Sequence, residues 1–364
     1  MRVLVYGFGG GLVGGVKKFL LSMNENMNDM VFDHVIDDTK CLRKDDIEAL
    51  GGKVYMVAPR RKLFTNMRQW WKLLKSWKKE NSDIVYFNVS SLNYTVPIWM
   101  ARWLGYRVIV HAHSNSMQQS LPIYTLFHYV NRVFFRLLKT TLFTNSALST
   151  VFMFGKSAKA DLIYNAIEPE TFRFNQQSRE SIRAKYSIEN KTVFGFVGRV
   201  EHPKNPLFLV DVFKIIHEKN PETALLIVGD GSAMEDVKKH IAEQHLEDAV
   251  ILAGAQLDAP AFYSAMDVFL LPSQFEGLGI VLIEAQCNGL PCVASADVIP
   301  AEAKVTDALR FISLTKPAEE WADCALSLAA EKRDRDADEM TVADSRYNIK
   351  TEALILEEKI KRCR

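Results

Sequence analysis

The alternation of apolar and polar residues along the chain predicts a regular succession of strands and helices. Short apolar runs are followed by segments in which hydrophobic residues recur at helical spacing, which is typical of β-α-β units and parallel sheets. The strands predicted in the first half are residues 2–7, 31–36, 53–58, 83–88, 106–114, 140–146 and 161–167. Those predicted in the second half are residues 192–200, 224–231, 250–254, 267–273, 291–295 and 308–312. We therefore predict an α/β protein with two doubly wound, Rossmann-like domains.

A polar stretch with few core candidates, residues 175–191, separates the two sets of strands. The length of 364 residues suits two domains of ordinary size. We predict an N-terminal domain over residues 1–178, a C-terminal domain over 186–343, and a helix over 344–364 that packs back toward the first domain and braces the two. Doubly wound folds bind ligands at the carboxyl ends of their strands, so we expect the two sheets to face a central cleft.

Glycines follow the first predicted strand. Gly9, Gly11 and Gly14 fit the pattern G-x-G-x-x-G, which lets a backbone approach a pyrophosphate at the start of a helix. Asp37 and Asp38 end the next strand about where a ribose-binding acid stands in dinucleotide-binding proteins. Taken alone, this half fits an NAD-dependent oxidoreductase, and that alternative stays open.

The second half has two carboxylates at a predicted strand-loop-helix junction. In PSQFEGLGIVLIEAQ a strand stops at Pro272, Glu276 lies in a loop with glycines, and Glu284 lies in the early turns of a helix. The N–H groups at a helix start offer an anion site. Carboxylates are unsuited to phosphate, but they accept hydrogen bonds from hydroxyls such as those of a sugar and a ribose. The structural alternative is a loop acid that caps a helix beside an exposed helical glutamate.

These motifs resemble those of retaining glycosyltransferases of family 4, which are large two-domain enzymes of the GT-B type. The resemblance rests on E-x7-E from Glu276 to Glu284, on GRVEHPKN at the start of the second domain, on LIVGDG, and on IYNAI before the linker. It implies transfer of a sugar from a nucleotide-diphosphate sugar, most commonly a UDP-sugar, to a glycan or lipid-linked acceptor. It also implies retention of the anomeric configuration and a role in capsular, exopolysaccharide or other surface polysaccharide synthesis.

The resemblance assigns the donor diphosphate to cationic side chains and bare backbone. Arg199 and Lys204 match the family residues that hold the diphosphate, whose charge grows as the sugar leaves. Backbone amides at the start of the following helix would assist them, at Leu278, Gly279 and Ile280. No metal and no cofactor is implied, because these groups take the leaving charge.

The resemblance also assigns the acids and one histidine. Glu284 resembles the acid that binds the ribose hydroxyls, and Glu276 resembles the catalytic acid that contacts the transferred sugar. His113, at the end of a core strand, matches the catalytic histidine beside the donor sugar, although His111 on the same face is an alternative.

The same resemblance gives the N-terminal glycines another meaning. Gly14 and Gly15 match a pair that lets the first loop approach the diphosphate and the acceptor without side chains in the way. Tyr86 and Asn88 stand where many relatives have histidines, so details of the acceptor side do not carry over.

Charge is divided unevenly along the chain. Residues 1–185 carry 26 Lys and Arg against 14 Asp and Glu, although the net charge of the whole chain is only +1. Basic residues are interleaved with large aromatics in PRRKLFTNMRQWWKLLKSWKKE, a composition typical of helices that bind anionic lipid. The predicted membrane contacts are Arg68, Trp70, Trp71, Lys72, Lys75, Trp77 and Lys78. The alternative is an ordinary helix packed on the sheet with a solvated basic side.

Other features limit the location and partners of the protein. No apolar run reaches the roughly 20 residues that a spanning helix needs. Five scattered cysteines support neither a disulfide framework nor a zinc site. We expect a cytoplasmic protein that binds peripherally to the inner face of the membrane, and no nucleic acid, since no recognised binding module accompanies the basic residues. A nucleotide-sugar epimerase of the same architecture is a further alternative.

Overall fold

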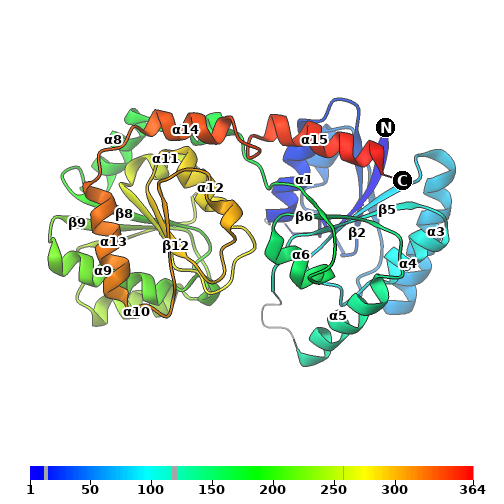
Figure 1. Ribbon diagram of the computed structural model, residues 1–364, viewed down its shortest axis with the longest axis horizontal. Coiled ribbons are helices and arrows are strands. Elements are labelled where there is room, and N and C mark those ends of the chain that lie inside the picture. Colours follow the sequence, from blue (N-terminus) through cyan, green and yellow to red (C-terminus); the bar gives the residue numbers. More distant parts are fainter. Residues whose placement is uncertain (12–14, 117–120, 257, 364) are drawn as a thin grey trace. The chain divides into compact units, whose positions relative to one another are not determined.

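The computed structural model describes residues 1–11, 15–116, 121–256 and 258–363. These residues form two compact units, which are described separately. The first holds Met1–Ala166 and Ile349–Arg364, and the second holds Ile167–Asn348. Each unit is a parallel sheet with helices packed on it (Figure 1). The two doubly wound, Rossmann-like domains predicted from the sequence are confirmed.

The described part of the first unit has seven parallel strands in the order β3-β2-β1-β4-β5-β6-β7. They are β1 (Arg2–Tyr6), β2 (Val31–Ile36), β3 (Val54–Met56), β4 (Ile84–Val89), β5 (Arg107–Ala112), β6 (Thr141–Thr144) and β7 (Asp161–Leu162). The strand order reverses direction between β1 and β4, which pair directly, Leu4 opposite Val85. The first and fourth strands are therefore the centre of the sheet.

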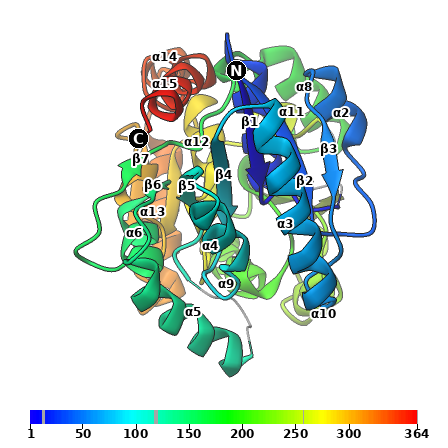
Figure 2. The same ribbon diagram turned by 90° about the vertical axis from the view of Figure 1, so that its right-hand side faces the viewer.

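Helices cover both faces of this sheet. They are α1 (Gly15–Glu25), α2 (Lys44–Ala49), α3 (Leu63–Glu80), α4 (Val96–Trp103), α5 (Pro122–Phe135), α6 (Ala147–Phe154) and α15 (Ile349–Arg362). Phe19 of α1 and Leu356 of α15 share one core cluster with the sheet, while Trp70 of α3 and Met153 of α6 share the other. Figure 2 shows α3, α4 and α5 together on one side of the first unit.

The second unit is built in the same way. In its described residues, six parallel strands have the order β10-β9-β8-β11-β12-β13. They are β8 (Thr192–Val197), β9 (Thr223–Val228), β10 (Val250–Gly254), β11 (Val268–Leu271), β12 (Cys292–Ser295) and β13 (Leu309–Ile312). The helices are α7 (Pro169–Phe172), α8 (Gln176–Lys185), α9 (Pro206–Lys219), α10 (Met234–Glu243), α11 (Ala259–Ala265), α12 (Ile280–Cys287), α13 (Ala318–Ala330) and α14 (Arg335–Ala343), with short 3-10 turns η1 (His202–Lys204) and η2 (Ala301–Ala303).

The segment expected to be a linker is instead part of the second unit. Arg179 and Arg183 of α8 both bind the carboxylate of Asp267 just before β11, at 2.6 and 2.5 Å. Arg183 is only 7% exposed. These ion pairs place the unit boundary at Ile167 rather than at residue 178. The polar composition that suggested a linker reflects buried charge pairs.

The C-terminal helix α15 belongs to the first unit. Its apolar residues Ile349, Ala353, Leu356 and Ile360 join the core cluster that contains α1, and the two helices lie side by side in Figure 1. Residues 167 and 348, at the two places where the chain passes between the units, form a parallel β-bridge. Among the described helices, none has the length and hydropathy needed to cross a membrane.

Candidate active site

Two loops of the second unit meet at the point where its strand order reverses. The reversal lies between the paired strands β8 and β11, and loops 198–205 and 272–279 leave their carboxyl ends. The backbone N–H groups of Gln274 and Phe275 both donate to the carbonyl of Pro203, at 2.9 and 3.2 Å. Doubly wound sheets bind ligands at such reversal points. Residues on these loops are therefore well placed to form a site.

The glycines of the LIVGDG motif allow the loop after β9 to pack tightly against the loop after β8. Gly229 has φ +143°, and a Cβ atom there would lie 1.8 Å from the carbonyl oxygen of Gly198. A Cβ atom at Gly231 would lie 2.3 Å from the carbonyl oxygen of Val200. Any larger residue would push the loop after β8 away from its present position. The two motifs are thus neighbours in space and shape the same loop.

Lys204 and Glu276, one from each loop at the reversal point, form an ion pair. Their side chains are only 17% and 14% exposed. Arg199 differs, because its side chain is 67% exposed and its Nη1 lies 2.8 Å from Oε1 of Glu201. An exposed pair of this kind contributes little to stability. Arg199 can therefore exchange its partner for another anion at small cost.

Helix α12 begins directly beside this ion pair. Gly279 precedes the helix with φ +79°, a left-handed conformation that favours glycine. Leu278 is 2% exposed, and Ile280 is the first helical residue. The first N–H groups of a helix have no acceptor within the helix itself. The start of α12 therefore offers backbone donors near Lys204 to an anionic ligand.

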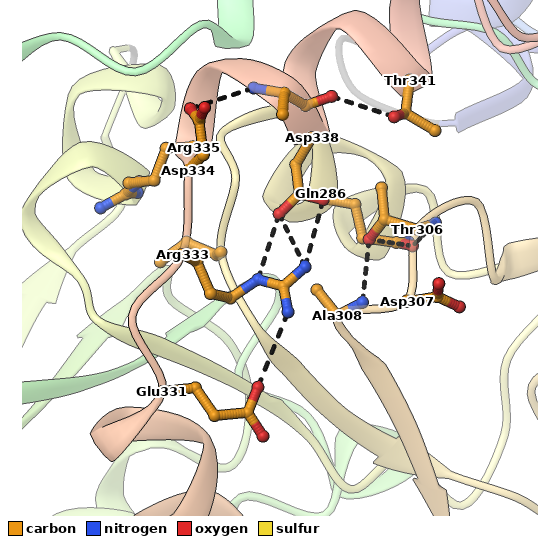
Figure 3. A network of polar contacts seen from close by, with 12 residues as sticks. Gln286, Thr306, Asp307, Ala308, Glu331, Arg333, Asp334, Arg335, Asp338 and Thr341 are labelled. Atoms are coloured by element: carbon orange, nitrogen blue, oxygen red, sulfur yellow. Dashed lines mark hydrogen bonds and ion pairs between the residues drawn. The ribbon is translucent and has the colours of Figure 1, made fainter.

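Gln286 anchors the far half of α12. Its Oε1 accepts from the backbone N–H groups of Val305 and Thr306, at 3.0 and 2.9 Å, and its Nε2 donates to the carbonyl of Ala303 at 2.8 Å. Figure 3 shows the contact of Gln286 with Thr306 and also the ion pair of Arg333 with Asp338, which lies in α14. Because α12 is fixed by these bonds, the position of its first turn is fixed too.

Glu284 lies one turn into α12 and is 6% exposed. Its Oε2 accepts a hydrogen bond of 2.8 Å from the hydroxyl of Tyr263 in α11. Burial, followed by the nearby charge of Glu284, raises the pKa of Tyr263 well above its ordinary value. Tyr263 therefore stays protonated and orients the carboxylate. Nothing in the APAFYSA segment around Tyr263 indicates this role from sequence.

His113 lies at the carboxyl end of β5 in the first unit and is bound to the neighbouring strand. Its Nε2 is 2.8 Å from Oδ1 of Asn88, whose Nδ2 donates to the carbonyl of Tyr6 at 3.3 Å. The Asn88 amide is thus oriented as an acceptor, so Nε2 of His113 carries the proton and donates. Burial lowers the pKa of His113 to about 3. Its Nδ1 is buried without a hydrogen-bond partner among the described residues, and it remains an acceptor.

His111 points into the same cluster but is completely buried. Its Nδ1 is 2.5 Å from the hydroxyl of Tyr86. The ring of Phe19 from α1 contacts both histidines edge-on, with centroid distances of 5.3 and 5.2 Å. Since His113 is nearer the strand end and less buried, it is the better placed of the two to meet a ligand.

The N-terminal glycine loop is described only in part. Gly14 lies outside the described residues, and a Cβ atom on Gly15, the first residue of α1, would meet no atom within 4 Å. Asp37, a candidate ribose acid in the oxidoreductase alternative, is already engaged. It accepts hydrogen bonds of 2.6 Å from the Tyr6 hydroxyl and 2.7 Å from Nε of Arg60.

The sequence and fold were compared with those of known proteins. The family model "Glycosyl transferases group 1" matches residues 178–338, which is most of the second unit. EpsF of Bacillus subtilis strain 168, whose name describes it as a glycosyltransferase, is 25% identical over 337 residues, covering 88% of this chain and 86% of EpsF. The second unit therefore matches the group 1 glycosyltransferases, and the chain is a glycosyltransferase.

One further relative resembles part of the sequence of this glycosyltransferase, and one solved structure resembles its whole fold. The UDP-Gal:alpha-D-GlcNAc-diphosphoundecaprenol alpha-1,3-galactosyltransferase of Escherichia coli is 41% identical over 109 residues, covering 29% of this chain and 28% of that enzyme. The crystal structure of Anabaena Alr3699/HepE in complex with UDP and glucose superimposes with a TM-score of 0.77 at 16% identity, covering 100% of both chains. The latter likeness shows the shared fold.

The structure corrects the predicted membrane contacts in α3 of this glycosyltransferase. Trp70 and Trp77 are at most 2% exposed, because they lie with Leu74 on the helix face that packs against the sheet. Nζ of Lys78 donates to the carbonyls of Leu104 and Gly105, each at 2.8 Å. Trp70 and Trp77 therefore do not contact lipid, whereas for the partly exposed Lys78 a membrane contact stays a prediction. Arg68, Trp71, Lys72 and Lys75 are at least partly exposed, and for them a membrane contact stays a prediction.

Within the described ranges, no three His, Cys, Asp or Glu side chains are grouped in a way that could hold a metal ion. The cations that lie at the candidate site are Arg199 and Lys204, both supplied by the loop after β8.

Proposed function

We propose that this glycosyltransferase moves a sugar from a nucleotide-diphosphate sugar, with UDP as the nucleotide, to a glycan or lipid-linked acceptor with retention of configuration. The observation that carries the proposal is the pairing of Lys204 with Glu276 at the β8–β11 reversal point, with Glu284 on the adjoining helix. One group of cations and two carboxylates suit a ligand with a diphosphate and several hydroxyls.

In this proposal the cations and the helix start receive the diphosphate. Arg199 turns from Glu201 toward the phosphates, while Lys204 exchanges the carboxylate of Glu276 for a phosphate oxygen. The N–H groups at the start of α12, around Leu278, Gly279 and Ile280, supply further donors. Charge on the leaving nucleotide is then stabilised as it develops, which is the largest contribution in many group transfers.

The two carboxylates, Glu276 and Glu284, accept hydrogen bonds from hydroxyl groups of the donor. Glu284, oriented by Tyr263, accepts hydrogen bonds from the ribose. Glu276, released from Lys204 when the diphosphate binds, contacts the transferred sugar. In the first unit, Nδ1 of neutral His113 accepts a hydrogen bond from a sugar hydroxyl, and the glycines at positions 14 and 15 of the sequence present no side chain to the diphosphate. This scheme needs no metal ion, so chelation by EDTA is expected to leave turnover unchanged.

The proposals for the acceptor, the donor nucleotide and the location draw on individual similar proteins. The galactosyltransferase that matches 29% of this chain is named for a diphosphoundecaprenol-linked acceptor, which supports a lipid-linked acceptor here. The HepE structure contains UDP and glucose, which supports UDP as the donor nucleotide. We accordingly propose a role in surface polysaccharide assembly, at the inner face of the membrane.

A thermal-shift screen tests the donor class. UDP and UDP-sugars are expected to raise the melting temperature, because a ligand that binds only the folded state stabilises it, whereas NADH is expected to have no effect. Stabilisation by NADH alone would favour the oxidoreductase instead. Release of UDP that depends on added acceptor would separate a transferase from an epimerase, which releases no nucleotide.

A further inference from the structure

Three polar side chains of helix α5 contact the rest of the first unit. Nδ1 of His128 accepts from the backbone N–H of Leu92 at 3.0 Å, and Nδ2 of Asn131 donates to the carbonyl of Leu92 at 2.6 Å. Nη1 of Arg132 donates to the carbonyl of Phe152 at 3.1 Å. These contacts hold α5 against the loop after β4 and against α6. The face of α5 that packs on the first unit thus combines these polar contacts with the buried ring of Phe135.

The apolar side chains of α5 lie on its outer face. Six of them are between 42% and 64% exposed: Ile123, Leu126, Phe127, Val130, Val133 and Phe134. Their spacing follows helical periodicity, so they form one continuous stripe. A helix in a soluble domain normally buries such a stripe, and contiguous exposed apolar surface marks a binding surface. We call this stripe the α5 face.

The segment of the chain that contains α5 is rich in basic residues. Between Asp83 and Asp161 the chain contains no acidic residue, whereas it contains seven Lys and Arg residues in the same segment. Arg136 and Lys139, directly after the helix, are exposed. Helix α3, which carries the exposed Lys72, packs on the same core cluster as Phe135 of α5. An apolar stripe with cations around it is complementary to an anionic lipid surface.

We propose that the α5 face inserts into the interfacial region of an anionic membrane while the neighbouring cations contact lipid headgroups. With 14 residues, α5 is too short to span a bilayer, so it would lie in the plane of the interface. A second copy of the chain is a poorer occupant, because two-fold pairing would bring the cations of both copies together. Nucleic acid would not require an apolar stripe.

The position of α5 in the chain relates this surface to the candidate site. The helix follows β5, whose carboxyl end carries His111 and His113. A membrane-bound acceptor would thus be presented at the strand end where His113 offers its Nδ1 atom. The membrane inference itself rests on exposure and charge alone, and it stands or falls independently of the proposed sugar transfer.

Vesicle flotation of the full chain tests the proposal. The variant Leu126→Ser/Phe127→Ser/Phe134→Ser removes half of the α5 face. The matched control Leu42→Ser/Leu354→Ser/Met340→Ser makes the same kind of change at exposed apolar residues elsewhere. Vesicles of phosphatidylcholine with phosphatidylglycerol are expected to float the wild type and the control, and to bind the α5 variant on the order of tenfold more weakly or worse.

Two further readouts keep the result interpretable. All three proteins should share one melting temperature, because the substituted side chains point outward. Flotation of the α5 variant at the wild-type level would overturn the proposal, as would binding that is governed by salt alone. Failure of the wild type to float, together with a dimer that the α5 variant abolishes, would overturn it in favour of a second copy.

Discussion

Lys204 and Glu276 form an ion pair between the two loops at the β8–β11 reversal point. In the absence of ligand, each neutralises the other, so a diphosphate has to displace Glu276 before it gains the full charge of Lys204. The pair therefore links donor binding to the release of the acid that is proposed to contact the sugar.

The substitution Glu276→Gln separates the effect of Glu276 on UDP binding from its proposed effect on sugar transfer. It removes the carboxylate that competes with phosphate, so UDP is expected to bind as tightly as in the wild type or up to about tenfold more tightly. Turnover is expected to fall about a hundredfold or more, since a charged group at the reacting sugar is lost. Calorimetric titration and a transfer assay measure the two quantities. Wild-type turnover in this variant would remove Glu276 from the mechanism.

Asn88 is expected to control the tautomer of His113. In Asn88→Leu the Nε2 proton loses its acceptor, and Nδ1 is no longer held as the unprotonated atom. The loss of one hydrogen bond of about 1 kcal/mol corresponds to about a fivefold decrease in kcat. UDP affinity should be unchanged. A loss of UDP affinity with normal kcat would show that Asn88 acts elsewhere.

Glu284 is expected to distinguish ribose from deoxyribose. The wild type should bind UDP about tenfold more tightly than 2′-deoxy-UDP, because a hydroxyl bound to a buried carboxylate is lost. In Glu284→Gln this preference should largely disappear, and in Tyr263→Phe, which removes only the orienting hydroxyl, it should decrease partly. Competition binding with the two nucleotides measures the ratio. An unchanged preference in Glu284→Gln would contradict the assignment.

The buried histidines predict that the protein is less stable in acid. His34 lies between Phe8 and Phe32 and is 1% exposed, and burial lowers its pKa to about 3. The unfolded chain therefore binds a proton below about pH 6.5 that the folded chain does not bind. The free energy of unfolding falls with decreasing pH between about 6.5 and 3, by up to about 1.4 kcal/mol per pH unit for this group.

Denaturant titrations at several pH values measure this slope. His34→Leu is expected to reduce the slope. Equal slopes for the wild type and His34→Leu would mean that His34 is protonated in the folded protein as well.

Much of the fold could be predicted because its signals are local. The apolar runs at 2–7 and 192–200 are short and contain a glycine at or near their end, Gly7 and Gly198, and they form β1 and β8, which are central strands of their sheets. The pattern E-x7-E placed Glu276 in a loop and Glu284 on a helix, because its glycines mark the helix start. Strands and helix starts of this kind are set by residues close together in the chain, so they can be predicted from the sequence.

Features that depend on partners distant in the chain were missed. The polar composition of residues 175–191 gave no sign that Arg183 pairs with Asp267, so the domain boundary was placed too late. The tryptophans of α3 were assigned to lipid, although Trp70 and Trp77 are spaced to lie on one helix face with Leu74. For α5 the sequence shows two helix faces, but only the packing of His128 and Asn131 shows which face lies inward.

The most direct test of the central claim is a calorimetric titration of UDP into the wild type and into Lys204→Ala, Arg199→Ala and the control Lys238→Ala. Lys238 is an exposed cation of the same unit, paired with Glu235 within α10. Binding to the wild type and the control should be equal. Both site variants should bind more weakly, Lys204→Ala by about ten- to a hundredfold. Equal affinity of UDP for Lys204→Ala and the wild type would contradict a diphosphate site at the β8–β11 reversal point.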